Sequence, residues 1–462
     1  MNWWTNNKGE FNKLAKLTGP ILVAQLTQML MSVVDTVMAG RKGAVDLAAV
    51  SVGGSIFVPA TLLVFGLALA LAPIISHLDG SNSHRRVANI LQQGFYACAI
   101  VGVITLLGMS SAPWLLDIME VEDDFRAITL DYLFYISWGI PGFVIYAVLR
   151  NFCEGLSNTM PSLIIGFIGL LINIPANYIF VYGEFGMPEL GGAGCGLATA
   201  IVLWGMALSM VVYTFTAKRY KRLRLLRRWY RPNWDDVTYV IRIGFPISMS
   251  LFFEVSLFAA VALLIAPLGP TVVSAHQIAL NISSLVYMVP LSISMAVTLR
   301  VGFALGAGNP KNAMLSFKLA MLFGGVFAGV NGLIMYLGGG WLASLYTPDQ
   351  DIINLAATLM GLAAIFTVSD TFQAISIGTL RGYKDTKYPM ILAFISYWPF
   401  GLTVGYILGL TDWVVPAMGA AGFWIGFISG LSVAAVLLSL RLRRVSRRYE
   451  RKHFREQLNS AA

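Results

Sequence analysis

Long apolar stretches follow one another along almost the whole 462-residue chain, and short charged segments separate them. A run of about 20 apolar residues is what an α-helix needs to cross the hydrocarbon core of a bilayer. Only 12% of the residues are charged, against about 25% in an ordinary soluble domain. The sequence therefore predicts an all-α integral membrane protein.

Twelve such stretches can be counted, so we expect twelve transmembrane helices. Their predicted ranges are 14–38, 47–76, 90–112, 130–152, 160–182, 193–216, 239–266, 273–300, 314–345, 353–378, 388–410 and 417–440. No small-residue cleavage site follows the first apolar stretch. We therefore expect this stretch to remain in the membrane as an uncleaved helix.

The basic residues are distributed unevenly over the segments between the spans. With the amino terminus in the cytoplasm, 29 of the 32 Lys and Arg residues fall on the cytoplasmic side, and only Arg41, Lys42 and Arg126 fall on the opposite side. Such an excess is typical of cytoplasmic loops, so we expect both termini in the cytoplasm. The basic segments 218–231 and 441–455 should contact lipid headgroups. The net charge of +9 therefore needs no nucleic-acid partner.

An internal repeat at an offset of 227 residues divides the chain in two. Segments 48, 78–82, 154–159 and 192 match segments 275, 305–309, 381–386 and 419. Six spans per repeat would give both halves the same orientation in the membrane, as in transporters built from parallel repeats. We therefore expect two six-helix lobes with a linker and a tail. The four predicted parts are an N-lobe (1–217), a basic cytoplasmic linker (218–238), a C-lobe (239–440) and a basic cytoplasmic tail (441–462).

Three acidic residues remain inside the predicted spans: Asp35, Glu254 and Asp370. A charge near the bilayer centre costs at least about 2.5–3.5 kcal/mol, so such residues usually face a cavity or an ion pathway. The sequence suggests no Lys or Arg deep in a span to pair with them. Their counterparts in the other repeat are not acidic. The repeat architecture does not require these acids, and we expect them to serve transport.

Polar residues that could accompany Asp35 follow in later spans. Asn173 and Asn177 lie four residues apart, on one face of a helix, and Thr199 lies in the next span. Pro175 leaves a backbone carbonyl one turn earlier without its helical donor. A carboxylate with amide and hydroxyl oxygens suits both Na⁺ and a proton. Hydrogen bonding between helices is the alternative role for the two amides.

Four segments carry a resemblance to a known family. VVDTVMAG (33–40), FIGLLINIPANYIFVYGEFGMPELGGAGCGLATA (167–200), LFFEVSLFAAVALLIAPLG (251–269) and LRGYKDT (380–386) resemble the NorM-type branch of the multidrug and toxic compound extrusion family. The resemblance runs along nearly the whole chain. It implies two six-helix lobes around a central cavity that opens to one side at a time. It also implies export of organic cations and fluoroquinolone-like drugs in exchange for Na⁺ or H⁺.

The resemblance also implies roles for individual residues. The residues matching the N-lobe cation site are Asp35, Asn173, Asn177 and Thr199. The residues matching the C-lobe acids, which would bind cation or substrate, are Glu254 and Asp370. Phe366 stands where related sequences often carry tyrosine, so a hydroxyl ligand is absent from the C-lobe site. The resemblance further implies residence in the bacterial inner membrane.

Three other functions are weighed against this one. A lipid-linked oligosaccharide flippase would need Lys or Arg inside its cavity to bind pyrophosphate, and the sequence suggests only acids there. An intramembrane enzyme would need a metal-binding set of histidines or a nucleophile beside a base, and neither is readable in the sequence. A channel fits two different acid sets less well than alternating access does. We expect no enzyme activity, no cofactor and no metal site apart from Na⁺ at Asp35. The expected partners of this monomer are cationic drugs and membrane lipids.

Overall fold

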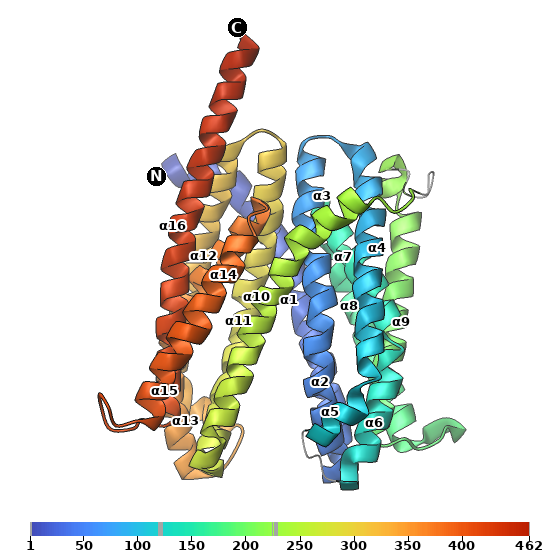
Figure 1. Ribbon diagram of the computed structural model, residues 1–462, viewed down its shortest axis with the longest axis vertical. Helices are drawn as coiled ribbons and strands as arrows, with labels where there is room; N and C mark the ends of the chain where they lie inside the picture. The colour runs from blue at the N-terminus through green and yellow to red at the C-terminus, as the bar shows by residue number, and fades with distance from the viewer. Residues whose placement is uncertain (1, 119–122, 224, 226–229, 462) are drawn as a thin grey trace. The chain divides into compact units, whose positions relative to one another are not determined.

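The structure is a computed structural model that describes every residue except 1, 119–122, 224, 226–229 and 462. The side chains of residues 2–7, 452 and 454–461 also lie outside the description. Parts of the predicted basic linker and tail are therefore not described. The described chain is helical throughout its ordered elements (Figure 1).

The chain forms two compact units. The amino-terminal unit comprises Gly19–Ser248, and the carboxy-terminal unit comprises Met1–Thr18 together with Met249–Ala462. Helices α1 (Asn2–Lys42) and α10 (Trp234–Ile265) each contribute residues to both units. The four parts expected from the sequence follow the predicted spans and loops, whereas the two units follow the contacts between residues. The four-part division therefore stays a prediction.

Helix α9 (Gly192–Thr216) makes many of the helix contacts in the amino-terminal unit. The other helices that lie wholly within this unit are α2 (Ala44–Leu69), α3 (Leu71–Gly80), α4 (His84–Met109), α5 (Ala112–Ile118), α6 (Asp123–Ser137), α7 (Ile140–Gly155), α8 (Met160–Tyr182), η1 (Glu184–Gly186) and η2 (Lys218–Leu223). Helices α6, α7 and α8 all pack on α9 (Figure 1). A Cβ atom on Gly196 of α9 would lie 2.5 Å from the Tyr132 carbonyl oxygen of α6. Such small residues let membrane helices approach closely.

Helix α13 (Gln350–Gly382) makes many of the helix contacts in the carboxy-terminal unit. The other helices that lie wholly within this unit are η3 (Ala266–Leu268), α11 (Pro270–Gly306), α12 (Pro310–Ser344), α14 (Lys387–Ile395), η4 (Ser396–Leu402), α15 (Thr403–Leu410) and α16 (Ala420–Ala461). Helix α13 packs against α11, α12 and α16. A side-chain hydroxyl of α11 also hydrogen-bonds to α13, since Thr298 Oγ1 donates to the Gly378 carbonyl at 2.7 Å.

The helices account for the predicted spans. Among the described residues, eleven helices or helix pairs are long and apolar enough to cross a membrane, and α6 with α7, bent by 46°, would make the twelfth. Pro141 stands at the start of α7, where it ends the helical hydrogen bonding of α6 and explains the bend. The prediction of an all-α membrane protein with twelve spans is confirmed.

One span contains an irregular segment. Helices α14 and α15 are joined by η4, a π-helical segment with Pro399 inside it. Proline cannot donate a backbone hydrogen bond, so the chain widens locally instead of breaking. Single π-helical turns occur frequently at functional sites, and η4 carries a tyrosine that belongs to the second site described below.

Candidate functional site

The Asp35 carboxylate of α1 accepts three hydrogen bonds from two other helices. Asn173 Nδ2 and Asn177 Nδ2 of α8 donate to one carboxylate oxygen at 2.9 and 2.7 Å. Thr199 Oγ1 of α9 donates to the other oxygen at 3.1 Å. The structure therefore brings together the four residues that the sequence predicts for the N-lobe site.

The asparagine orientation differs from the expectation. Both amides present their N–H groups to Asp35, and the Oδ1 atoms of Asn173 and Asn177 are buried without a hydrogen-bond partner in the described structure. Asp35 is thus surrounded by amide N–H groups where the sequence suggests amide oxygens, because an ionised carboxylate needs donors when nothing else neutralises it. A buried unpaired carbonyl oxygen costs about 1–3 kcal/mol. Rotating each amide by half a turn would direct these two oxygens toward a cation.

Asp35 lines a cavity of ≈ 540 Å³ in the amino-terminal unit. Its wall is largely apolar and includes five aromatic side chains: Phe57, Phe65, Tyr132, Phe143 and Tyr146. Small-molecule sites usually have this form, with a volume of a few hundred Å³ and a few placed polar groups. The acid that the sequence singles out thus faces a drug-sized space.

A second charged side chain on the cavity wall is Arg150 of α7. Arg150 and Glu154 are each 1% exposed, and Arg150 Nε donates to Glu154 Oε1 at 2.8 Å. The expectation that the cavity contains only acids is therefore wrong. Both residues stand at the cytoplasmic end of a predicted span. At such a position the sequence alone does not tell whether two opposite charges form a buried ion pair or lie in a solvent-exposed loop.

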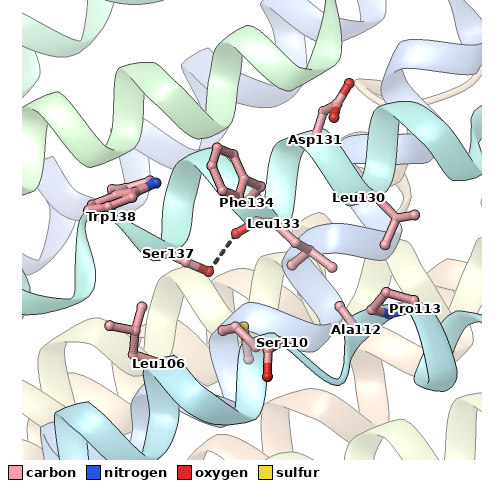
Figure 2. Close-up of a pocket in the computed structure, with 11 residues that line it drawn as sticks. Leu106, Ser110, Ala112, Pro113, Leu130, Asp131, Leu133, Phe134, Ser137 and Trp138 are labelled. Atoms are coloured by element: carbon pink, nitrogen blue, oxygen red, sulfur yellow. Dashed lines mark hydrogen bonds between the residues drawn. The ribbon is translucent and has the colours of Figure 1, made fainter.

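Another cavity, of ≈ 530 Å³, lies between α4, α5 and α6 (Figure 2). Among its described lining residues only Asp131 is charged, and Figure 2 shows it pointing away from Leu106 and Ser110. The Ser137 hydroxyl is engaged by its own helix, donating to the Leu133 carbonyl at 2.5 Å. This cavity offers no group comparable to the Asp35 cluster.

The other two predicted acids lie in the carboxy-terminal unit. Glu254 is on α10 and Asp370, which is 5% exposed, is on α13. The two carboxylates are close enough to interact electrostatically. Neither accepts a hydrogen bond from any described residue, in contrast to Asp35. The structure brings these two acids together but surrounds them with fewer donors.

Three residues that the sequence analysis missed accompany this acid pair. Arg381 of α13 interacts electrostatically with Glu254. Tyr287 of α11 and Tyr397 of η4 interact with both acids. No sequence signal marks Tyr287, whereas Tyr397 stands two residues before Pro399, the residue around which the π-helical segment forms.

Phe366 lies one helical turn before Asp370 and packs into an aromatic cluster. Its ring contacts Trp424 edge-on at a centroid distance of 5.5 Å, and the rings of Phe258 and Phe427 are both 6.3 Å away. The ring is 5% exposed. Phe366 therefore packs against its aromatic neighbours beside the carboxy-terminal site and has no hydroxyl that could bind a cation.

Phe366→Tyr is expected to strengthen cation binding at the carboxy-terminal site. The new hydroxyl would lie on the helix face of Asp370 and add an oxygen ligand, worth about 1 kcal/mol. We expect the half-saturating concentration of the cation that this site binds, the coupling ion or a cationic substrate, to fall about 5-fold in a transport assay. Phe427→Tyr adds a hydroxyl to the same cluster on a different helix and serves as the control. An unchanged dependence of Phe366→Tyr on both cations would contradict the expectation.

Comparison with known proteins places the chain among transporters. The MatE family model matches residues 20–179 and 246–407. The two matched segments start 226 residues apart and end 228 residues apart, which supports the internal repeat at an offset of 227. The predicted family is confirmed, as is the prediction of a transporter rather than an enzyme.

Individual relatives agree. The chain is 99% identical over 462 residues to the "Probable multidrug resistance protein NorM" of Idiomarina loihiensis, with 100% of both chains covered. A protein of the same name from Shewanella oneidensis is 45% identical over 435 residues, covering 94% of this chain and 95% of that protein.

Solved structures share the fold. The eukaryotic MATE transporter AtDTX14 has a TM-score of 0.85 at 21% identity, covering 96% of this chain and 98% of that chain. A MOP superfamily transporter from Pyrococcus furiosus has a TM-score of 0.86 at 20% identity, covering 95% and 96%. From the repeated family match and these relatives, the chain belongs to the MatE family of multidrug and toxic compound extrusion transporters.

Proposed function

We propose that this multidrug efflux transporter exports organic cations and fluoroquinolone-like drugs in exchange for Na⁺ or H⁺ by alternating access. The observation that carries the proposal is Asp35, a carboxylate on the wall of a drug-sized aromatic cavity. Its three hydrogen-bond donors stabilise the anion, and two buried amide oxygens beside it have no hydrogen-bond partner among the described residues. The site can therefore hold a cation or remain empty as an anion.

Competition for Asp35 couples ion entry to drug exit. One carboxylate neutralises one monovalent cation, so Na⁺ or a proton at Asp35 displaces a drug ammonium group. Exporting a monovalent cation against an inside-negative potential costs about 2.3 kcal/mol per 100 mV. Taking in one Na⁺ or H⁺ for each drug molecule cancels this cost and leaves the ion gradient as the driving force.

The carboxy-terminal acids supply a second cation site. Glu254, Asp370 and Arg381 together carry a formal charge of −1 when all three are ionised, so one monovalent cation neutralises the group. Tyr287 and Tyr397, which interact with both acids, offer hydroxyl oxygens as further ligands. Hard monovalent cations favour carboxylate and hydroxyl oxygens of this kind. This site binds either the coupling ion or the ammonium group of the drug.

The proposed location is the bacterial inner membrane, with both termini in the cytoplasm. The excess of Lys and Arg on one side supports this orientation. Two of the three basic residues assigned to the outer side form ion pairs with acids of the same side, Lys42 with Glu189 and Arg126 with Asp117. A monomer suffices for the proposed exchange, since each chain carries both acid sets.

A lipid-linked oligosaccharide flippase is the alternative function. Arg150 on the cavity wall removes the sequence argument against it, because a basic residue is available. It is a single guanidinium that already has Glu154 as its counter-ion at 2.8 Å, whereas a pyrophosphate carries at least two negative charges and needs several basic groups around it. The relatives named for multidrug resistance favour drug export.

Ethidium flux in proteoliposomes tests the proposal. Purified protein is reconstituted, and ethidium movement is followed with an imposed Na⁺ gradient, an imposed pH gradient, or neither. We expect at least one gradient to accelerate drug movement against its concentration gradient, and the effective gradient identifies the coupling ion. An ionophore that collapses the gradient is the control. Drug movement independent of every gradient would overturn the proposed antiport.

A further inference from the structure

The cavity of the amino-terminal unit carries one acid and one base on its described wall. Asp35 and Arg150 both line it, and every other described lining residue is uncharged. The base contacts the helix of the acid, because Arg150 Nη1 donates to Gln28 Oε1 of α1 at 3.4 Å. Gln28 and Asp35 are seven residues apart on α1, which is about 10 Å along a helix. The two charges thus stand about two helical turns apart along one wall.

The guanidinium of Arg150 keeps donor capacity toward the cavity. Nε donates to Glu154 Oε1 and Nη2 donates to Gln25 Oε1, both at 2.8 Å. The bond from Nη1 to Gln28 is much longer, at 3.4 Å. The guanidinium also interacts with the Tyr146 hydroxyl on the cavity wall. The long Gln28 bond is the one that a ligand exchanges most easily. Guanidinium has five N–H donors in a planar fork that fits a carboxylate. A carboxylate entering the cavity can replace the Gln28 oxygen at Nη1.

Stability alone is a weak reason for this ion pair. Arg150 and Glu154 are almost completely buried, and Ser162 Oγ also donates to Glu154 Oε1 at 2.8 Å. Replacing a buried ion pair with well-packed apolar residues is often neutral or stabilising. An ion pair placed in a cavity wall is better explained if one partner also serves a ligand. Glu154 does not line the cavity, whereas Arg150 does.

We propose that Arg150 forms an anion-binding subsite for amphoteric aromatic substrates. The ammonium group of the substrate binds at Asp35, its carboxylate binds at Arg150, and its ring system lies against cavity side chains such as Phe57 and Phe143. Aromatic rings favour such offset or edge contacts. The substrate class is a flat molecule whose two opposite charges lie about 10 Å apart, matching the helix spacing. This inference rests on the proposed drug export.

Arg150 therefore influences which substrates the transporter prefers. A substrate that carries only an ammonium group uses Asp35 and leaves Arg150 with its protein partners. An amphoteric substrate gains a charge-assisted contact with Nη1 at the other end. The transporter should accordingly prefer a compound with a free carboxylate over the same compound with that carboxylate blocked.

A matched pair of compounds tests the subsite. A piperazinyl fluoroquinolone and its ethyl ester share the ring system and the ammonium group and differ in the carboxylate. Efflux of each is measured in proteoliposomes, and the ratio of their kcat/KM values is compared among variants. In the double variant Arg150→Gln with Glu154→Gln, both charges are lost together and the two amide groups can still hydrogen-bond to each other. We expect the ratio of free acid to ester to fall at least about 10-fold, the usual scale for a charge-assisted contact.

Further variants separate binding from folding. Glu154→Gln alone leaves the guanidinium without its counter-ion and should raise the ratio. The control is the other buried Arg–Glu pair, Arg300 with Glu10, in which Nε and Nη2 both donate at 2.8 Å. Arg300→Gln with Glu10→Gln should leave the ratio as in the parent protein, because neither residue lines the cavity.

The outcomes distinguish this inference from the proposed function. If the parent protein moves neither compound under any ion gradient, the proposed drug export itself fails. If the parent moves both, an unchanged ratio in the Arg150/Glu154 double variant overturns the subsite alone. An equal loss of both compounds in that variant also overturns it, because equal loss is what a structural role produces.

Discussion

Replacing Asp35 with asparagine is expected to abolish ion-driven drug export while the protein is still made and inserted into the membrane. Asparagine keeps the size of the side chain, and its Oδ1 atom can still accept a hydrogen bond from Asn173 or Asn177. The charge is lost, however, and two unit charges 4 Å apart attract by about 4 kcal/mol near a protein surface. Neither the coupling ion nor a drug ammonium group is then held. We expect the efflux rate to fall at least about 100-fold.

The measurement is ethidium efflux from proteoliposomes under the gradient that drives the parent protein, with equal amounts of reconstituted protein. Asp131→Asn is the matched control. Asp131 is an exposed acid of the same unit with no part in the Asp35 cluster, and its loss should leave efflux close to the parent rate. Normal ion-driven efflux from Asp35→Asn would contradict the assignment of coupling to this residue.

The Asp35 cluster could be predicted because its signals are strong and local. An acid in an apolar span is costly, and two asparagines four residues apart must share a helix face. The direction of the amides could not be predicted, since it depends on what else neutralises the carboxylate. The cavity around Asp35 also depends on packing between helices that are far apart in the sequence.

Buried charges near span ends are harder to find. Sequence assigns Glu10, Arg150 and Glu154 to cytoplasmic segments, yet Arg150 and Glu154 form a buried ion pair and Glu10 lies in a part-buried one. A hydropathy profile averages over a whole span, and two charged residues one helical turn apart at its end barely change that average. Glu10 pairs with Arg300, which lies 290 residues away, so no local pattern connects them.

The carboxy-terminal site shows a related limit. Glu254 and Asp370 stand out in the sequence for the same reason as Asp35. Tyr287 and Tyr397 do not, because tyrosines are common at membrane interfaces and only the folded helices bring these two near the acids. A functional site in a membrane protein is thus predictable from its charged residues, and its neutral ligands are predictable only where they show a local spacing, as Asn173 and Asn177 do.

Glu254→Gln and Asp370→Asn are each expected to reduce ion-coupled efflux at least about 10-fold. The reason is the charge balance of the group, which is −1 with both acids and Arg381 ionised. Removing one acid brings the group to neutrality, so a cation is no longer attracted. Removing both leaves a net positive charge that repels cations, and the double variant should be inactive. The measurement is the initial rate of ethidium efflux at several ion concentrations.

The dependence on ion and drug then identifies what these acids bind. If they bind the coupling ion, its half-saturating concentration rises in the single variants while the KM for drug at saturating ion is unchanged. If they bind drug, that KM rises instead. Asp351→Asn, an exposed acid at the start of the same helix as Asp370, is the control and should behave as the parent. Parent-like efflux from the double variant would show that the amino-terminal site alone carries the exchange, because a group with net positive charge cannot hold a cation.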